Sequence, residues 1–388
     1  MTATDLLVVA GEASGDLHAA RLLAHLQRLQ PSVRPFGLGG EEMKTVGFDA
    51  LADSSEIAVV GITEVLKILP RARQIFQQLL AESESRGARY AILVDSPDFN
   101  LRLAKRLRQQ GVRVIYYISP QVWAWRRRRV RQIARDVDLM LVLFPFEVEF
   151  YAEHGVRAVH VGHPLVDEVP VFAPPDATEE GEAKTVSLLP GSRGSEVRAL
   201  LPTQLQAAAL LAQDRPLTVR LIRAPSVKPE MFETILAQYP LPESARLEII
   251  TRDRFAAIAG SDLALCASGT ATLEVGLIGT PLIVVYRLNR WSYWLGRLLV
   301  DLPFFSLVNL VMNEKIVPEL LQHDAEPEGI YATAAPLLAE PGRRAAMRQK
   351  LAGLRARLGE GGASQRAAEQ VAAYLAGKTG ETITGETE

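Results

Sequence analysis

Two glycine-containing turns in the second half of the chain have the residues to hold an anionic ligand. The stretch "LLPGSRGSE" places Arg193 after a tight turn at Gly191 and Ser192, where a guanidinium can grip a diphosphate through two parallel hydrogen bonds. By itself this pattern also fits a simple turn with a solvated arginine. The stretch "LALCASGTATLE" ends an apolar run in a polar turn whose backbone N–H groups could cradle phosphate at the start of a helix. That turn consists of Ser268, Gly269 and Thr270.

A glutamate follows the second turn at a sequence spacing that would suit contact with a ribose. Glu274 lies four residues after Thr270, on the first turns of the predicted helix, where it could accept both hydroxyls of a ribose. The alternative is a carboxylate that stabilises the start of that helix. The chain contains neither G-x-G-x-x-G nor G-x-x-x-x-G-K-[ST], which disfavours dinucleotide and ATP chemistry. These features together favour a nucleoside diphosphate as the ligand.

Parallel sheets must position these turns. Apolar runs such as "LLVVA", "YAILVD", "TVSLLP" and "PLIVVY" alternate with helix-length segments in both halves, as in strands that helices cover on both faces. The sequence therefore predicts an α/β architecture twice over. We expect an N-terminal domain over 1–168, a Pro- and acid-rich linker over 169–184, and a second domain over 185–335. Helices over 336–377 are expected to pack back on an N-domain, their own or a partner's, before a disordered tail over 378–388.

Composition excludes several classes of protein. The chain has 388 residues, and its 43 basic and 45 acidic residues leave a net charge of -2, which disfavours a nucleic-acid partner. Its single cysteine, Cys266, excludes an internal disulfide and suits a reducing compartment. The N-terminus lacks the pattern of a secretory signal and no apolar stretch reaches spanning length, so we expect a cytoplasmic protein. Its six histidines show no metal-binding spacing, which predicts a reaction without metal or other cofactor.

Ordered sequence blocks carry a family resemblance. "VAGEASGDLHAA", "VDSPDFNLRLAKRLR", "YYISPQVWAW", "FPFEVEFY", "LLPGSR" and "SGTATLEVGLIGTPLIVVY" resemble lipid-A-disaccharide synthases, from Gly11 to about Gln322. The resemblance implies a GT-B glycosyltransferase fold, with two Rossmann-like domains facing a cleft. It also implies an inverting transfer, in a Gram-negative bacterium, of a sugar from UDP-2,3-diacylglucosamine to 2,3-diacylglucosamine 1-phosphate. The products would be a β-1,6-linked disaccharide 1-phosphate and UDP.

Inverting transfer needs a group that removes the proton of the acceptor hydroxyl. In "VDSPDFN" a buried run ends with Asp95 and Asp98, either of which could instead cap the helix expected near Asn100. We expect Asp98 to be the general base and Asp95 to position it or the acceptor. Asn309 is a further polar candidate, although Val308 stands where the family commonly has proline.

The segment "GEASGDLHAA" is the other candidate of the first half. Its residues are expected to meet a phosphate of the donor or acceptor, and its histidine is either a base or a structural residue. The predicted contacts are Glu12, Ala13, Ser14, Gly15 and His18.

Tryptophans and arginines gather in two places, "PQVWAWRRRR" and "RWSYWLGRLLVDLPFF". Such mixtures are typical of contact with an anionic lipid surface, although the first could be core residues beside a solvated helix face. The predicted membrane or acyl-chain contacts are Trp123, Trp125, Arg126 and Arg127 in the first place, and Trp291, Trp294, Phe304 and Phe305 in the second. We therefore expect a peripheral enzyme on the inner face of the inner membrane. We also expect that it can form a homodimer.

Two other functions share the same sequence features. One is a UDP-N-acetylglucosamine 2-epimerase, or another UDP-sugar enzyme on the same fold. The other is a membrane module that binds UDP-sugar without catalysis. Fold alone would not separate these functions.

Overall fold

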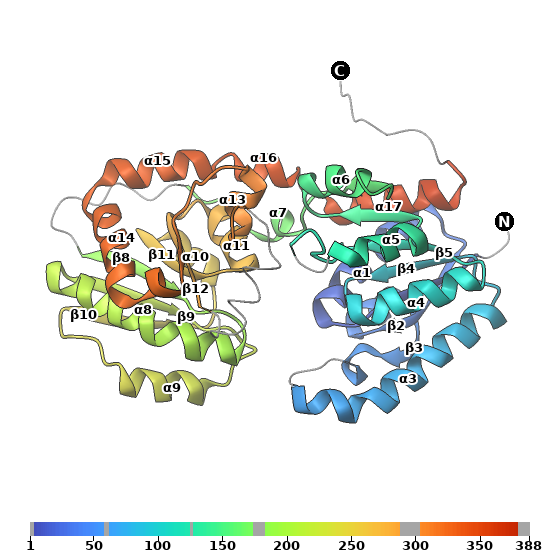
Figure 1. Ribbon diagram of the computed structural model, residues 1–388, viewed down its shortest axis with the longest axis horizontal. Helices are drawn as coiled ribbons and strands as arrows, with labels where there is room; N and C mark the ends of the chain where they lie inside the picture. Colours follow the sequence, from blue (N-terminus) through green and yellow to red (C-terminus); the bar gives the residue numbers. More distant parts are fainter. Residues whose placement is uncertain (1–3, 58–61, 125–126, 174–182, 288–302, 379–388) are drawn as a thin grey trace, which may run out of the picture. The chain divides into compact units, whose positions relative to one another are not determined.

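The computed structural model describes residues 4–57, 62–124, 127–173, 183–287 and 303–378. The chain forms two compact units (Figure 1). The first contains Met1–Pro164 and Gly359–Glu388, and the second contains Leu165–Leu358. The chain thus enters the second unit shortly before the predicted linker and returns to the first near its C-terminal end.

The first unit is built on a seven-stranded parallel sheet with the order β3-β2-β1-β4-β5-β6-β7. Its central strands are apolar and buried on both faces, as helices on both sides require. The chain order reverses between β1 and β4, and ligands of such sheets bind beyond the carboxyl ends of strands at this reversal. The strands are β1 (Thr4–Ala10), β2 (Val33–Gly39), β3 (Asp49–Asp53), β4 (Tyr90–Val94), β5 (Arg113–Tyr117), β6 (Leu139–Val142) and β7 (Ala158–His160).

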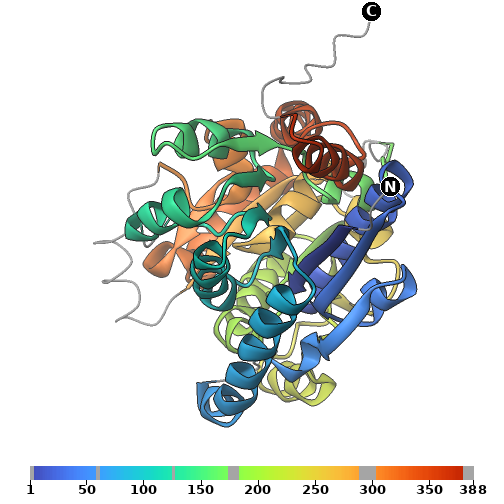
Figure 2. The ribbon, with the colours of Figure 1, turned by 90° about the vertical axis from the view of Figure 1, so that its right-hand side faces the viewer.

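Helices on both faces complete this unit. They are α1 (Ala13–Leu29), α2 (Glu41–Thr45), α3 (Ile62–Ser85), α4 (Pro97–Gln109), α5 (Val130–Asp136), α6 (Pro145–Ala152) and α17 (Ala363–Leu375). The last helix, α17, packs on α1 of the same chain through Ala367, Ala368 and Val371. Gln30 adds a side-chain hydrogen bond to the Ala372 carbonyl (2.9 Å). Figure 2 shows this unit toward the viewer. The red α17 lies there beside elements of the N-terminal half.

The second unit repeats the plan with a six-stranded parallel sheet, in the order β10-β9-β8-β11-β12-β13. The reversal here lies between β8 and β11, so the turns that follow these two strands lie at neighbouring strand ends. The strands are β8 (Lys184–Leu189), β9 (Leu217–Ile222), β10 (Ala245–Ile250), β11 (Leu263–Ala267), β12 (Leu282–Tyr286) and β13 (Glu319–Leu321). The helices are α7 (Leu165–Glu168), α8 (Gly194–Asp214), α9 (Pro229–Gln238), α10 (Arg254–Ala259), α11 (Thr270–Ile278), α13 (Leu307–Met312), α14 (Pro327–Ala339), α15 (Pro341–Leu351) and α16 (Leu354–Leu358).

The helices after residue 336 divide between the units, whereas the sequence led us to expect all of them on an N-domain. α15 and α16 stay in the second unit, and only α17 packs in the first. Buried Arg344 explains part of this: it donates to the Leu337 and Leu338 carbonyls at the end of α14 and pairs with Asp262 (3.6 Å). Within the described residues, no helix is long and apolar enough to cross a membrane.

Candidate active site

The strand ends at the reversal in the first unit carry unusual backbone. Asp95 (φ 48°) and Ser96 (φ 44°) follow β4, and Ile118 (φ 65°) follows β5, all in the left-handed region that residues with side chains rarely adopt. Surrounding contacts hold this conformation, because Asn100 Nδ2 (2.8 Å) and Tyr116 Oη (2.5 Å) both donate to the Asp95 carbonyl. Backbone strain of this kind gathers at functional sites.

The two aspartates, which the sequence led us to expect as base (Asp98) and positioning residue (Asp95), differ in environment. Burial and the nearby Glu12 carboxylate raise the pKa of Asp95 to about 6. Asp98, in contrast, is 71% exposed and forms an ion pair with Arg129. A carboxylate with a raised pKa is suited to accept a proton near neutral pH, whereas the carboxylate of Asp98 is already engaged by the Arg129 guanidinium. The structure therefore favours Asp95 over Asp98 as the base.

The loop after β1 lies directly beside Ser96. A Cβ atom on Gly11 would lie 2.7 Å from Ser96 Oγ, so a larger residue here would require the Ser96 side chain to shift. Glu12 is exposed at this point, next to Asp95. The sequence did not single out Ser96, whose position depends on the contact between two loops that are distant in the chain.

Most of the segment "GEASGDLHAA" is helix rather than loop, because α1 begins at Ala13. Ala13 and Ser14 are exposed on its first turn, and Gly15 is buried against Val94 and Ala10. His18 is half-buried on the next turn. Its charge contributes, after burial, to lowering the pKa of His163 to about 3.

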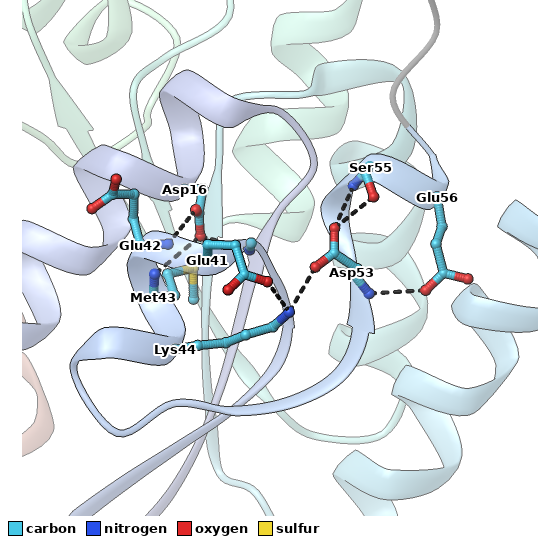
Figure 3. Close-up of polar contacts among 9 residues, drawn as sticks. Asp16, Glu41, Glu42, Met43, Lys44, Asp53, Ser55 and Glu56 are labelled. Atoms are coloured by element: carbon cyan, nitrogen blue, oxygen red, sulfur yellow. Dashed lines mark hydrogen bonds and ion pairs between the residues drawn. The ribbon is translucent and has the colours of Figure 1, made fainter.

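Asp16 anchors a second loop to the start of α1. Its buried carboxylate accepts hydrogen bonds from the backbone N–H groups of Gly40 (2.6 Å), Glu42 (3.0 Å) and Met43 (3.3 Å) (Figure 3). Although Asp16 lies on the first turn of α1, its carboxylate caps the start of α2. Within α2, Lys44 pairs with Glu41, and it also pairs with Asp53 at the end of β3, whose backbone N–H donates to Glu56 (Figure 3).

Substituting Asp16 by asparagine is expected to lower the free energy of unfolding by about 2 kcal/mol, because an amide turns one N–H group toward a cluster of N–H donors. Urea unfolding measures this change. Glu41→Gln, which alters an exposed ion pair, is the control and should change stability by less than about 0.5 kcal/mol. Equal effects of the two substitutions would contradict the anchoring role of Asp16.

In the second unit, the turn after β11 presents a helix N-terminus. Gly269 adopts φ 139°, and no atom of the described residues lies within 4 Å of the place where its Cβ would be. α11 begins at the exposed Thr270 without a side-chain cap. Ser268 Oγ donates to the Phe305 carbonyl (3.2 Å), which fixes one side of the turn. Uncapped N–H groups at such a helix start suit phosphate oxygens.

Glu274 is held in place on α11. Its side chain is 17% exposed, and one carboxylate oxygen lies 3.1 Å from Arg254 Nη2. Burial raises the pKa of Glu274, while Arg254 acts in the opposite direction. A carboxylate fixed by a neighbouring arginine is suited to accept hydroxyl hydrogen bonds. Arg254 lies on another helix, α10, and no pattern in the sequence indicated its role.

The turn after β8 is folded around its own carboxylate. Gly191 adopts φ 111°, and the backbone N–H groups of Ser192 (3.0 Å) and Arg193 (3.2 Å) donate to Glu196 Oε2. Arg193 Nη1 donates to Glu196 Oε1 (3.0 Å), although the arginine side chain is 79% exposed. The fold thus brings together both predicted diphosphate turns at neighbouring strand ends, with Glu196 added.

Asn309 is bound on all sides by hydrogen bonds within the second unit. It is fully buried on α13, and its amide group donates to the Val317 carbonyl and Glu319 while accepting from the N–H groups of Ile316 and Val317. These partners use the hydrogen-bonding capacity of the side chain. The catalytic role expected for Asn309 is therefore not supported.

Trp123 is a core residue, which contradicts the membrane contact expected for it. It is 5% exposed, its Nε1 donates to Glu147 (3.1 Å), and its ring packs edge-on against Phe144 and Phe146. Burial raises the pKa of Glu147 to about 7. Phe304 is half-buried and Phe305 is 40% exposed. Trp125, Arg126, Trp291 and Trp294 lie outside the described residues, and Arg127 opens the 3₁₀ turn Arg127–Arg129.

In the parts of the chain that the structure describes, no three histidine, cysteine or acidic side chains gather as metal ligands would. The donors for an anionic ligand are the backbone N–H groups and arginine of the two turns in the second unit. The candidate base lies at the strand ends of the first unit.

Comparison with known proteins identifies the family. Residues 6–375 match the family model of lipid-A-disaccharide synthetase. A lipid-A-disaccharide synthase of Myxococcus xanthus (strain DK1622) is 46% identical over 379 residues, which cover 95% of this chain and 97% of the relative.

Two solved structures show the same fold at low identity. A putative UDP-N-acetylglucosamine 2-epimerase from Listeria monocytogenes is 11% identical, with a TM-score of 0.67, over 98% of this chain and 99% of that one. MurG of Acinetobacter baumannii is 14% identical, with a TM-score of 0.59, over 95% of this chain and 99% of that one. Both agree with two Rossmann-like units of GT-B type. The match over nearly the whole chain shows that this protein belongs to the lipid-A-disaccharide synthase family.

Proposed function

We propose that this chain is the glycosyltransferase of lipid A biosynthesis that joins UDP-2,3-diacylglucosamine to 2,3-diacylglucosamine 1-phosphate. The observation that carries the proposal is the family match over residues 6–375, together with 46% identity to a lipid-A-disaccharide synthase. The products are the β-1,6-linked disaccharide 1-phosphate and UDP. This activity combines a UDP-sugar donor with a sugar-phosphate acceptor.

The donor is assigned to the second unit, in the domain expected over residues 185–335. Arg193 and the N–H groups at the start of α11 are suited to the diphosphate, and Glu274 to the ribose. As the bond between the sugar C1 and the diphosphate oxygen breaks, these groups stabilise the negative charge that collects on UDP. Protein groups thus supply positive charge and N–H dipoles to the leaving group.

The acceptor is assigned to the first unit, in the domain expected over residues 1–168. Asp95 accepts the proton of the acceptor 6-hydroxyl while that oxygen forms the new bond to C1 on the face opposite the departing UDP. The raised pKa of Asp95 supports this role, as does its place at the sheet reversal. Glu12 and Ser96 are the neighbouring polar groups suited to orient the acceptor.

The acyl chains of both substrates lead us to propose the inner face of the inner membrane as the site of action. Among the described residues, Phe305 supports this proposal, because it is exposed next to the turn at Ser268. A homodimer and a reaction without metal or cofactor remain predictions.

A pH profile tests the assignment of the base. Asp95 accepts a proton only in its ionised form, and that form increases as pH rises through its pKa of about 6. We expect kcat/KM to rise between pH 5 and 7 along a limb with an apparent pKa near 6, and then to level. The Asp98→Asn variant should keep the same limb. A limb near the ordinary aspartate pKa, about 4, would contradict the assignment.

A UDP-release assay with four mixtures tests the function. Purified protein in detergent micelles, without added metal, receives the acylated donor alone, the acylated acceptor alone, both together, or UDP-N-acetylglucosamine. We expect UDP only where donor and acceptor are both present. UDP from the donor alone would indicate hydrolysis, and turnover of UDP-N-acetylglucosamine would favour an epimerase.

The comparisons do not favour the other two functions considered. The epimerase likeness rests on fold at 11% identity, whereas the synthase likeness extends over nearly the whole sequence. A binding module without catalysis would not require a carboxylate with a raised pKa at the sheet reversal.

A further inference from the structure

The first diphosphate turn of the second unit already holds an anion, the carboxylate of Glu196. That carboxylate accepts from the N–H groups of Ser192 (3.0 Å) and Arg193 (3.2 Å), and from the Arg193 guanidinium (3.0 Å). Two backbone N–H groups and a guanidinium are the donors that a phosphate group takes at such a turn. Glu196 therefore engages the Arg193 guanidinium that the proposed function assigns to the diphosphate, together with two backbone N–H groups of the same turn.

Glu196 also fills the space that a phosphate needs. A Cβ atom on Gly191 would lie 2.4 Å from Glu196 Oε2, so the carboxylate lies directly on the glycine of the turn. Tyr286, at the end of β12, lies near enough for the charges of both Glu196 and Arg193 to influence its pKa, after burial has raised it. A diphosphate placed against this turn would meet a negative charge within contact distance.

The second turn of the unit provides an internal comparison. At Gly269 no atom from the described part of the chain lies within 4 Å of the Cβ position, and among these residues α11 begins without a side-chain cap. The turn at Gly191 is thus occupied by a carboxylate of the helix that follows it, whereas at the Gly269 turn no described side chain covers the helix start. A nucleotide that uses both turns has to displace Glu196 from the first.

We propose that Glu196 is a displaceable stand-in for a phosphate of the UDP-sugar and sets how tightly the donor and UDP bind. The carboxylate keeps the turn ordered when no nucleotide is bound, leaves when the diphosphate arrives, and returns as UDP departs. Breaking the contacts of Glu196 costs little free energy, because Arg193 is largely exposed and exposed ion pairs contribute little to stability. The diphosphate carries more charge than the carboxylate and therefore binds the same hydrogen-bond donors more strongly.

The inference rests on the proposed donor site and is tested by calorimetric titration of UDP into wild type and Glu196→Gln. Loss of the competing charge is expected to tighten UDP binding about 5- to 10-fold. Uridine, which has no phosphate, should bind both proteins equally. Glu230→Gln is the matched control: it removes an exposed carboxylate from the first turn of the neighbouring helix α9, and UDP affinity should stay at the wild-type value.

A permanent helix cap predicts the opposite sign. If Glu196 organises the turn for phosphate and stays there, Glu196→Gln will weaken UDP binding, and that result, or an unchanged affinity, overturns the inference. Glu196→Asp provides a second variant if the glutamine variant does not fold: its shorter side chain reaches the turn less well, so UDP should again bind more tightly. Wild-type protein that fails to bind UDP would instead defeat the proposed function.

Discussion

Asp95→Asn is expected to lower kcat about 10³-fold with little change in KM for the donor, because the amide cannot accept the proton of the acceptor hydroxyl. Asparagine has nearly the same shape as aspartate, and the backbone at Asp95 is held by Asn100 and Tyr116 through its carbonyl oxygen. The fold around the site should therefore survive. Initial rates of UDP release, with both acylated substrates at saturation, measure the loss.

Asp98→Asn is the matched control for this experiment. It makes the same chemical change three residues away, at an exposed side chain whose partner is Arg129. We expect its kcat to stay within about 5-fold of wild type, because removing an exposed ion pair costs less than about 1 kcal/mol. The reverse ranking of the two variants would restore the assignment made from the sequence, with Asp98 as base.

The second large effect concerns Asn309. Asn309→Ala is expected to lower the free energy of unfolding by about 4 kcal/mol, because it leaves the N–H groups of Ile316 and Val317 and the Val317 carbonyl without their partner in a buried place. The midpoint of urea unfolding measures this loss. Glu314→Ala, which breaks an exposed pair with Lys350 near the end of the same helix, should change stability by less than about 0.5 kcal/mol.

Activity measurements decide between structure and catalysis at this position. At a temperature where Asn309→Ala remains folded, its kcat per folded molecule should stay within about 10-fold of wild type, because the side chain faces backbone groups rather than a ligand. A variant that keeps full stability and loses activity would show that Asn309 acts in the reaction after all.

The repeated α/β plan could be predicted from the sequence because it is encoded locally. Runs of Val, Ile and Leu such as "LLVVA" and "AILV" become strands buried on both faces, and the intervening segments become their helices. The turns at Gly191 and Gly269 were predicted for the same reason, since a glycine with positive φ is required where each strand gives way to a helix.

The choice of Asp95 or Asp98 as the base could not be made from the neighbouring residues in the sequence. Asp95 and Asp98 both follow β4, but the pKa of Asp95 depends on burial beside Glu12 of another loop, and Asp98 is neutralised by Arg129 from a later segment. The spacing of residues in a sequence carries no information on such contacts. The sequence therefore located the acidic pair, and the contacts of its two members lead us to propose Asp95 rather than Asp98 as the base.

Long-range partners explain the other differences. Trp123 is buried because Glu147, which follows it by 24 residues, accepts its indole N–H. Asp16, on α1, finds its three donors at Gly40 and in α2, which follow β2. Arg344 keeps α15 in the second unit through Asp262, more than eighty residues earlier in the chain. In each case a single polar side chain finds its partner only after the sheets have formed.

Structural determination of the reaction product tests the central claim most directly. Wild-type protein is incubated with UDP-2,3-diacylglucosamine and 2,3-diacylglucosamine 1-phosphate in micelles, and the lipid product is isolated for mass spectrometry and for NMR of its anomeric proton. The account predicts a disaccharide 1-phosphate with a β-1,6 linkage, formed in equal amount to UDP. An α linkage, or release of free diacylglucosamine with no disaccharide, would contradict it.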